Sequence, residues 1–232
     1  MRLNKYLAKC GIGSRRKCDN YIEKGKIKIN GIINNDYSYM VKPGDYIQYN
    51  NQLLELIATT SYILHKPKGY ICSQLDNSNR KIIYNLLPEK SNLFSIGRLD
   101  YNTTGIILLT NDGDLCYKLS HPKFNIQKKY YVLTDNKLSD KNLLKIKKGI
   151  TIDNNVKVNA YISFLGIKNK LNIWNVVLTE GKNREIKKIF NYFSVNVIKL
   201  HRYEYAGLNL EGISEGKYRK INLNEIKILN SD

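Results

Sequence analysis

The side chains best suited to chemistry stand in three separate segments of the chain. Asp100 follows Arg98 in SIGRLDYNTTGIILLTNDGDL, Tyr130 lies in KKYYV, and Lys187 lies in EGKNREIKKIF. A carboxylate can attack a carbon or remove a proton, an aromatic ring can hold a flat ring, and a nearby cation favours an ionised carboxylate. Each residue also has an ordinary structural explanation: a surface loop, a strand core and an exposed helix face. The residues taken singly therefore leave chemistry and structure both open.

The segment from Ile96 to Leu115 resembles the GRLD motif of RNA pseudouridine synthases, which isomerise uridine in RNA to pseudouridine. The resemblance implies that Asp100 is the nucleophilic aspartate. It also implies that Arg98 contacts a phosphate or organises the site, and that Gly97 permits a tight backbone path into it. The length of the match favours this functional interpretation over a chance Arg-Leu-Asp on a loop.

The isomerisation breaks a carbon–nitrogen glycosidic bond, reorients the uracil and forms a carbon–carbon bond. It needs a carboxylate, a cation that keeps the carboxylate ionised, an aromatic face for the loose base and a way to extract the nucleotide from its stack. No metal or redox cofactor is required, so we expect none. The four cysteines agree with this expectation, because they are scattered, without a C-x-x-C pair or a histidine at zinc-finger spacing.

Two further segments resemble motifs of the same family, in the same order. KKYYV resembles its K-x-Y strand, which implies that Tyr130 is the aromatic neighbour of the target base and Lys128 a supporting cation. EGKNREIKKIF resembles its E-G segment with a basic helix, which implies that Lys187 lies opposite Asp100 as the charge partner. A lysine here keeps the charge but lacks the paired contacts of the arginine that some relatives carry.

Weaker resemblances add further predicted contacts. LHRYEYAGLNL resembles a family strand in which Leu200 packs beside the active site and Arg202 supports it. The KPKG turn resembles the one that opens the catalytic domain of these enzymes, and we assign Lys66 and Lys68 to RNA or structural contacts. Lys188 is assigned to RNA as well, although an exposed helix face would also explain a lysine there.

The first fifty residues contain a second resemblance. RLNKYLAKCGIGSRRKCDNYIEKGKIKING resembles the small RNA-binding domain first seen in ribosomal small-subunit protein four, the alpha-L motif. The resemblance implies that Arg15, Arg16 and Lys17 contact structured RNA through its backbone and shape. Cations in the first turn after Ser14 oppose the helix dipole by roughly 0.3–1 kcal/mol, a conflict that a bound phosphate removes. The alternative for this basic run is a solvated charged face.

Charge and composition restrict the partners. Lysine and arginine number 38 against 20 aspartate and glutamate, which gives a net charge of +18. Such an excess favours polyanions, because each neutralised phosphate releases condensed counterions. AT-rich codons or a merely soluble surface would also produce this composition. We expect no membrane contact, because there is no long apolar run and no signal-peptide core. The predicted location is cytoplasmic, or an organelle matrix if a transit peptide has been removed.

Hydrophobic spacing predicts an α+β fold with two domains. We expect an alpha-L RNA-binding domain over 1–56, a linker over 57–61 and a mixed, largely antiparallel pseudouridine synthase domain over 62–232. In the first domain, we expect two helices followed by a small sheet. Gly11 and Gly13 end the first helix, Ser14 caps the second, and Gly25 ends the second. Polar residues 50–52 also look like linker. The strands and helices expected in the second domain are strands at 62–66, 70–73, 105–110, 129–133 and 171–179, and helices near 82–87, 140–148 and 184–193.

The order of the motifs resembles the RsuA/RluB-type branch of the family, whose members modify ribosomal RNA. Within that branch, NRE after EGK and DYNTTG after Asp100 resemble the RluB-like large-subunit enzymes. The expected target is therefore large-subunit ribosomal RNA, and the expected partners are ribosomal RNA or ribosome-assembly intermediates bound by a monomer. Three alternatives stay open: the same chemistry on small-subunit or transfer RNA, a catalytically silent RNA-binding ribosome-assembly factor, and a ribosomal protein.

Overall fold

The computed structural model describes residues 1–76, 78–88, 92–153 and 155–230. The chain divides into two compact units. The first contains Met1–Thr60 together with Asn92 and Leu93, and the second begins at Ser61 and contains the rest of the described chain. Both units combine helices with sheets, so the predicted α+β class is confirmed. In the described ranges, no helix has both the length and the apolar character that crossing a bilayer requires.

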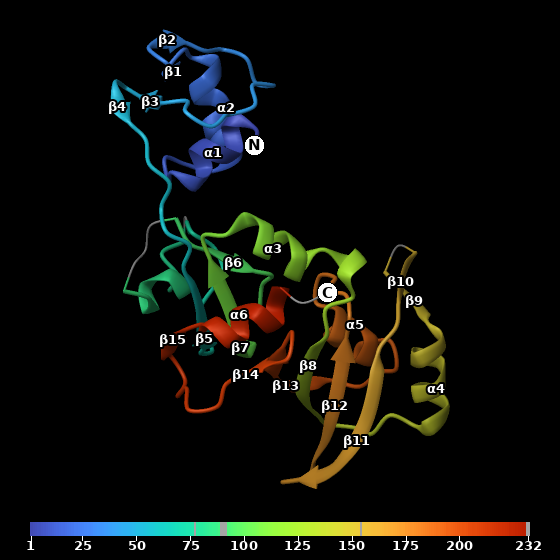
Figure 1. Cartoon of the computed structure of the whole chain (residues 1–232). Helices are drawn as coiled ribbons and strands as arrows, with labels where there is room; N and C mark the ends of the chain where they lie inside the picture. The colour runs from blue at the N-terminus through green and yellow to red at the C-terminus, as the bar shows by residue number, and fades with distance from the viewer. Residues whose placement is uncertain (77, 89–91, 154, 231–232) are drawn as a thin grey trace. The chain divides into compact units, whose positions relative to one another are not determined.

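The first unit packs two helices against a small antiparallel sheet (Figure 1). Helix α1 (Leu3–Lys9) and helix α2 (Arg15–Glu23) precede a sheet in the order β2-β1-β3-β4, with bounds Ile32–Ile33, Ile27–Ile29, Ile47–Tyr49 and Gln52–Leu53. Ser14 caps α2 as predicted, since its side chain accepts a hydrogen bond from the Lys17 amide at 3.3 Å. The apolar stripes of both helices bury Leu3, Leu7, Cys18 and Ile22 against the sheet.

Residues 50–52 are not a linker, and that prediction is wrong. Asn50 and Asn51 have φ angles of 50° and 67°, and they connect β3 to β4 as a tight hairpin turn. Asparagine adopts this left-handed region more readily than most residues, so a polar pair that looks like a linker forms a turn instead.

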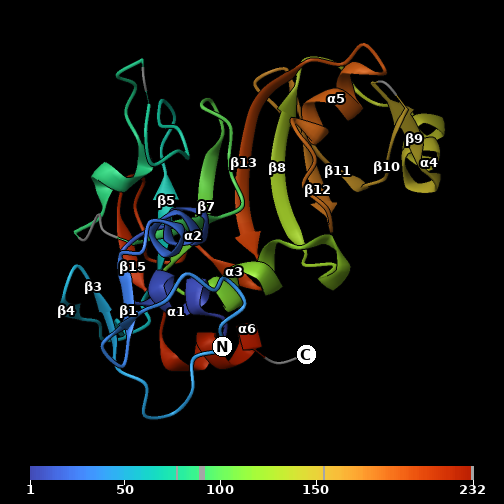
Figure 2. The ribbon, with the colours of Figure 1, turned by 90° about the horizontal axis from the view of Figure 1, so that it is seen from above.

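The second unit is built on one large mixed sheet with helices against its faces (Figures 1 and 2). The strands of the second unit are β5 (Ser61–Lys66), β6 (Phe94–Ile96), β7 (Thr104–Thr110), β8 (Lys128–Thr134), β9 (Ile150–Ile152), β10 (Val156–Val158), β11 (Tyr161–Lys168), β12 (Leu171–Leu178), β13 (Val197–Tyr205), β14 (Leu208–Asn209) and β15 (Tyr218–Lys220). The helices are α3 (Gly113–Ser120), α4 (Asp140–Lys148), α5 (Glu185–Asn191) and α6 (Leu223–Asn230), with 3-10 helices at Ile83–Leu86 and Pro122–Phe124.

The large sheet has the strand order β11-β12-β8-β13-β7-β5-β15, with β6 beside β7 and β14 beside β13. Its neighbouring strands are antiparallel except β13 and β7, which are parallel over the short register His201↔Thr104 and Arg202↔Gly105. Figure 2 shows β13 running between β8 and β7. This short seam joins a half built from β11, β12 and β8 to a half built from β7, β5 and β15.

Sequence pattern explains the position of the central strands. Every residue of β7 is buried, as its continuous apolar run predicts, because strands lie on both edges and α3 and α6 pack over one face. Strand β12 alternates instead, and its buried face contains Trp174, whose indole N–H donates to the Thr134 hydroxyl at 2.8 Å. Helix α5 covers that face, with Phe190 against Trp174 at a ring-centroid distance of 6.0 Å.

Two predicted elements of the second unit differ from the structure. Residues 70–73 form no strand; Ile71 makes only an isolated bridge to Ile82. The helix expected at 82–87 is the single 3-10 turn Ile83–Leu86. The sequence interpretation also omitted α3, α6, β6, β11 and the β9–β10 hairpin, which are short or lack a clear period.

Candidate active site

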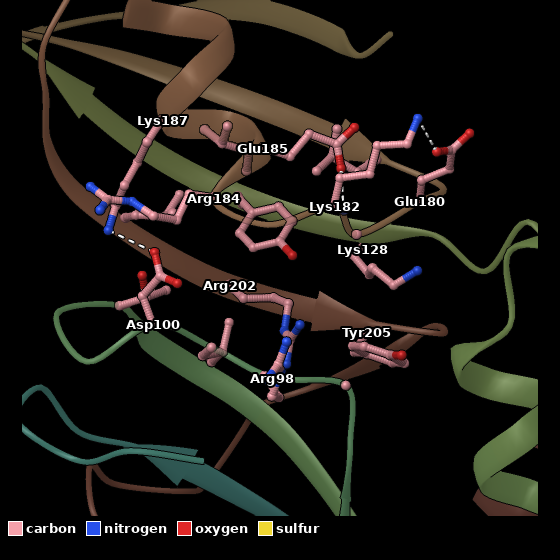
Figure 3. Close-up of a pocket in the computed structure, with 18 of the residues that line it drawn as sticks. Arg98, Asp100, Lys128, Glu180, Lys182, Arg184, Glu185, Lys187, Arg202 and Tyr205 are labelled. Carbon is pink, nitrogen blue, oxygen red and sulfur yellow. Dashed lines mark hydrogen bonds and ion pairs between the residues drawn. The ribbon is translucent and has the colours of Figure 1, made fainter. Parts of the chain in front are cut away.

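The predicted catalytic residues meet in a pocket of the second unit (Figure 3). The loop between β6 and β7 supplies Arg98, Asp100 and Thr103, and strands β8 and β13 supply Tyr130 and Arg202. The loop after β12 and the first residues of α5 form another wall, and Ser120 and Pro122 line the pocket as well. The pocket lies where the two halves of the sheet meet, so its lining comes from both sides of the β7–β13 seam.

Asp100 and Lys187 form an ion pair across this pocket. The Lys187 Nζ donates to the Asp100 Oδ2 at 2.8 Å, although 87 residues separate the two in sequence. Their side chains are 35% and 23% exposed, so the carboxylate remains accessible from the pocket. The structure thus places Lys187 opposite Asp100, as the motif resemblance implied.

The buried side chain of Lys66 holds the backbone around Asp100 in place. The Lys66 ammonium donates to the carbonyl oxygens of Asp100 at 3.1 Å, Thr103 at 2.9 Å and Pro67 at 3.0 Å. Its side chain is fully buried, which removes it from solvent and from RNA. Of the two kinds of contact predicted for Lys66, the RNA contact is therefore wrong and the structural contact is confirmed, because Lys66 positions the loop that carries Asp100.

Burial lowers the pKa of Lys66 from 10.5 to about 8, because the desolvated ammonium outweighs the nearby thiol and carboxylates. Cys72 supports the same loop, since its Sγ lies 3.4 Å from both the amide nitrogen and the carbonyl oxygen of Leu99. Burial also raises the pKa of this thiol. Segment 70–73, although not a strand, thus contributes to positioning the loop.

The floor of the pocket is aromatic and apolar. Tyr130 is 7% exposed and Leu200 is 8% exposed, and both line the pocket. Arg202 is almost fully buried. Its Nε donates to the carbonyl of Ile106 in β7 at 2.8 Å, and its guanidinium lies 4.7 Å from the Tyr205 ring centroid. One nitrogen of Arg202, Nη2, is buried with no hydrogen-bond partner among the described residues. A polar group of this kind is usually completed by a ligand or water.

The seam beside Arg202 depends on Gly105. A Cβ at this position would lie 2.1 Å from the Arg202 carbonyl oxygen, so no larger residue fits without separating β7 from β13. Gly105 has a φ of 119°, a value that other L-residues rarely adopt. The glycine therefore permits the close approach that brings Arg202 to the pocket.

Lys128 and Glu185 hold the far end of the pocket, and both are buried. The Lys128 ammonium donates to the carbonyls of Ile126 at 2.9 Å and Thr179 at 3.1 Å, and burial lowers its pKa to about 8. The Glu185 carboxylate accepts from the Lys182 amide at 2.8 Å, and burial raises its pKa. Lys182 in turn pairs with Glu180 at 2.7 Å and donates to the carbonyl of residue 157. These contacts fix the loop that leads into α5.

Two arginines of the pocket lining have different surroundings. Arg98 and Arg184 are exposed, and neither side chain makes a hydrogen bond or ion pair with another described residue. Arg184 has a φ of 52°, the left-handed region that is unusual for a side chain of this size. Figure 3 draws Arg184 at the same end of the pocket as Asp100 and Lys187.

The other residues assigned to RNA lie outside the pocket. Arg15, Arg16 and Lys17 are exposed in the first turn of α2, in the first unit. Lys68 is exposed next to the β5 end, and Lys188 pairs with Asp153 at 2.8 Å. Their contacts with RNA stay predictions.

Sequence reasoning missed several residues of the site. Arg184, Lys182 and Glu185 stand in the quoted EGKNRE segment, and Tyr205 stands in LHRYEYAGLNL, but none was singled out. Gly181 and Asn183 signal a loop before the helix, but they do not indicate which residue of that loop is left-handed. The burial of Tyr205, which raises its pKa to about 12, had no visible signal.

This arrangement can hold a planar ring over Tyr130 and Leu200 and present an ionised carboxylate to it. Six cations line the pocket against three carboxylates, an excess of three positive charges, so the ligand that enters is expected to be anionic. Among the described residues, no three His, Cys, Asp or Glu side chains gather in a way that could hold a metal ion.

Comparison with known proteins covers both units. The family described as RNA pseudouridylate synthase matches residues 60–192, and the S4 domain family matches residues 1–47. Ribosomal large subunit pseudouridine synthase B of Bacillus subtilis (strain 168) is 35% identical over 98% of this chain and 95% of that protein. The protein of the same name from Escherichia coli O157:H7 is 30% identical, over 98% and 82%. A crystal structure described as that of pseudouridylate synthase has a TM-score of 0.70 at 28% identity, covering 99% of each chain.

Proposed function

The chain belongs to the RNA pseudouridylate synthase family and carries an S4 domain, and on that premise we propose that it isomerises a uridine of large-subunit ribosomal RNA. The family membership establishes the reaction, uridine to pseudouridine in RNA. Two observations support the large subunit as target: full-length relatives named for it, and the EGKNRE segment that resembles the RluB-like enzymes. The partner is then ribosomal RNA or a ribosome-assembly intermediate, while the monomeric state and cytoplasmic location stay predictions.

The observation that carries the site assignment is the ion pair of Asp100 and Lys187 at the mouth of a pocket floored by Tyr130. Asp100 acts on the flipped uridine as a nucleophile, at the sugar C1′ or the uracil C6, or as a base that removes a sugar proton. All three routes need an ionised carboxylate, and the Lys187 ammonium holds that carboxylate in place through the 2.8 Å contact to Oδ2. Tyr130 and Leu200 hold the detached uracil while it turns.

Fixed backbone geometry contributes to this chemistry. Lys66 and Cys72 hold the loop of Asp100, and Lys128 joins the start of β8 to the end of β12. Because these contacts are buried, the carboxylate is positioned before RNA arrives, which lowers the reorganisation needed for reaction. The exposed cations of α2 in the first unit bind the RNA that surrounds the target uridine.

Lys187→Met is expected to lower kcat about 10- to 100-fold with a smaller change in KM. The substitution removes a charged hydrogen bond to Asp100 that matters to the reacting carboxylate more than to RNA docking. Single-turnover kinetics on the unmodified RNA substrate would measure the effect. Lys187→Arg should recover much of the rate, because the charge returns.

The matched control is Lys129→Met. Lys129 pairs with Glu204 at 2.9 Å and is 30% exposed, which is close to the 23% of Lys187, but it does not line the pocket. A loss in the control equal to that of Lys187→Met would show that any missing ion pair slows the enzyme, and would contradict a specific role for Lys187.

The proposed target is tested by carbodiimide-stop primer extension across unmodified large- and small-subunit ribosomal RNA. A new stop in the large-subunit RNA, absent with Asp100→Asn, is the expected result. A stop confined to small-subunit or transfer RNA would reject the target but keep the reaction. If neither naked RNA nor assembly intermediates are modified, the chain is a catalytically silent RNA-binding factor.

A further inference from the structure

The cations of the pocket divide into those that the protein itself neutralises and those that it leaves without a partner. Lys187 pairs with Asp100, Lys182 pairs with Glu180, and Lys128 donates to two carbonyls. Arg98 and Arg184 have no such partner among the described residues. An arginine guanidinium carries five donors in a rigid fork, so two unpaired forks beside one pocket indicate a ligand rich in acceptor oxygens.

Exposure separates Arg202 from the two exposed arginines of the pocket, Arg98 and Arg184. Arg202 is 2% exposed and its unpartnered Nη2 lies inside the protein, where only the part of a ligand that enters fully can come close. Arg184 is exposed at the rim. When a nucleotide leaves its stack, the base enters the pocket but the chain-linked phosphates stay at the mouth. A rim arginine therefore meets phosphate, and a buried one does not.

The backbone of Arg184 supports the same role. Its left-handed conformation, φ 52°, is one that a residue of this kind adopts at a cost of order 1 kcal/mol. The conformation is maintained by its neighbours: the Lys188 amide donates to the Arg184 carbonyl at 3.0 Å, and the Glu185 side chain accepts from the Lys182 amide. Such a strained residue in a pocket wall is more often functional than incidental.

We infer that Arg184 binds a phosphate that flanks the flipped uridine, so that the nucleotide is held at its backbone while Asp100 acts on its sugar or base. The inference rests on the proposed pocket for the flipped uridine and adds a subsite to it. Arg184 stands just before α5 and Lys187 in its first turn, and Figure 3 draws both side chains at the same end of the pocket. Lys187 neutralises Asp100, and Arg184 then supplies the positive charge that draws the phosphate.

The test uses a synthetic RNA hairpin that contains the uridine located by primer extension. Three versions carry a normal phosphodiester, or a neutral methylphosphonate on the 5′ or the 3′ side of that uridine. Arg184→Gln is expected to lower kcat/KM about 10- to 100-fold on the normal RNA. On the RNA whose contacted phosphate is neutral, the variant and the parent enzyme should differ by less than about twofold, because the partner charge is already absent.

Two further readouts separate phosphate binding from a structural role. Arg184→Lys should fall between the parent and Arg184→Gln, because it keeps the charge but loses the fork. The dependence of log KM on log salt should be shallower by about one for Arg184→Gln. Lys147→Gln removes an exposed cation of α4 outside the pocket and should change kcat/KM by less than about twofold on every RNA.

An equal loss for Arg184→Gln on charged and neutral RNA, or no loss at all, would overturn the inference. Either outcome leaves the proposed reaction standing as long as the parent enzyme makes pseudouridine and Asp100→Asn does not. If the modified uridine lies outside large-subunit RNA, the same hairpin test is made with that sequence, and only the proposed target is lost. A parent enzyme that modifies no RNA would overturn both.

Discussion

Asp100→Asn is expected to lower turnover by at least about 10⁴-fold while RNA affinity changes less than about threefold. The amide keeps the shape of the side chain but can neither attack carbon nor accept a proton, so every route open to the carboxylate is blocked. Affinity is retained because the exposed cations of the first unit and of the pocket rim are unchanged. Single-turnover conversion of uridine, with RNA binding measured in parallel, checks both halves of the expectation.

The structure offers a close control for this substitution. Asp153 also pairs with a lysine of α5, Lys188, at 2.8 Å, but it lies outside the pocket. Asp153→Asn should therefore retain turnover within about threefold. Appreciable conversion by Asp100→Asn, above about one hundredth of the parent rate, would reject Asp100 as the reacting group.

Lys66→Met is expected to lower the free energy of unfolding by about 1–3 kcal/mol at pH 7 and kcat by about 10²-fold. Methionine has a similar length but cannot donate, so the carbonyls of Pro67, Asp100 and Thr103 lose their buried partner. The loss is partly offset, because the buried ammonium is itself costly at neutral pH. The rate falls because small misplacements of a reacting group are expensive. Chemical denaturation and single-turnover kinetics measure the two effects.

The pH dependence of stability provides a separate check on Lys66. Its pKa is about 8 in the folded protein against an ordinary 10.5, so between these values the unfolded chain binds a proton that the folded chain has lost. Stability from this group therefore rises with pH across the window 8 to 10.5, by about 3 kcal/mol in all. The free energy of unfolding of the parent protein should therefore rise relative to that of Lys66→Met as the pH increases from 8 to 10.5. Lys220→Met changes an exposed lysine on neighbouring β15 and should show the same pH dependence as the parent protein. A difference that is constant with pH would contradict the burial of a charged Lys66.

Sequence predicted the residues of the site better than their surroundings. Asp100, Tyr130 and Lys187 were all placed by motif, and the structure brings them to one pocket. For Lys66 the sequence left RNA and structural contacts both open, because a lysine in a K-P-K-G turn has the pattern of a surface loop. Its burial depends on carbonyls of a segment more than thirty residues away, which periodicity cannot reveal.

The sequence also did not predict the local conformation of two segments, at Arg184 and at residues 70–73. Arg184 gives no signal in composition, since a left-handed arginine is identified only by its backbone angles. Residues 70–73 have the β-branched and aromatic character of a strand, but Ile71 makes only an isolated bridge to Ile82, so tertiary context overrides propensity. The hairpin between β1 and β2, by contrast, follows from turn chemistry at Asn30 and Gly31, because both residue types adopt the positive φ angles that the turn requires.

The place of β13 in the sheet also determines when the enzyme can become active. β13 is synthesised after every other long strand, yet it lies between β8 and β7 and meets β7 only through the short seam at Gly105 and Arg202. Before β13 inserts, the loop that carries Asp100 and the helix that carries Lys187 are attached to two sets of strands that β13 has yet to join, and closing so distant a contact is slow. A chain still emerging from the ribosome therefore has no assembled catalytic pair until Tyr205 has been made and has left the exit tunnel.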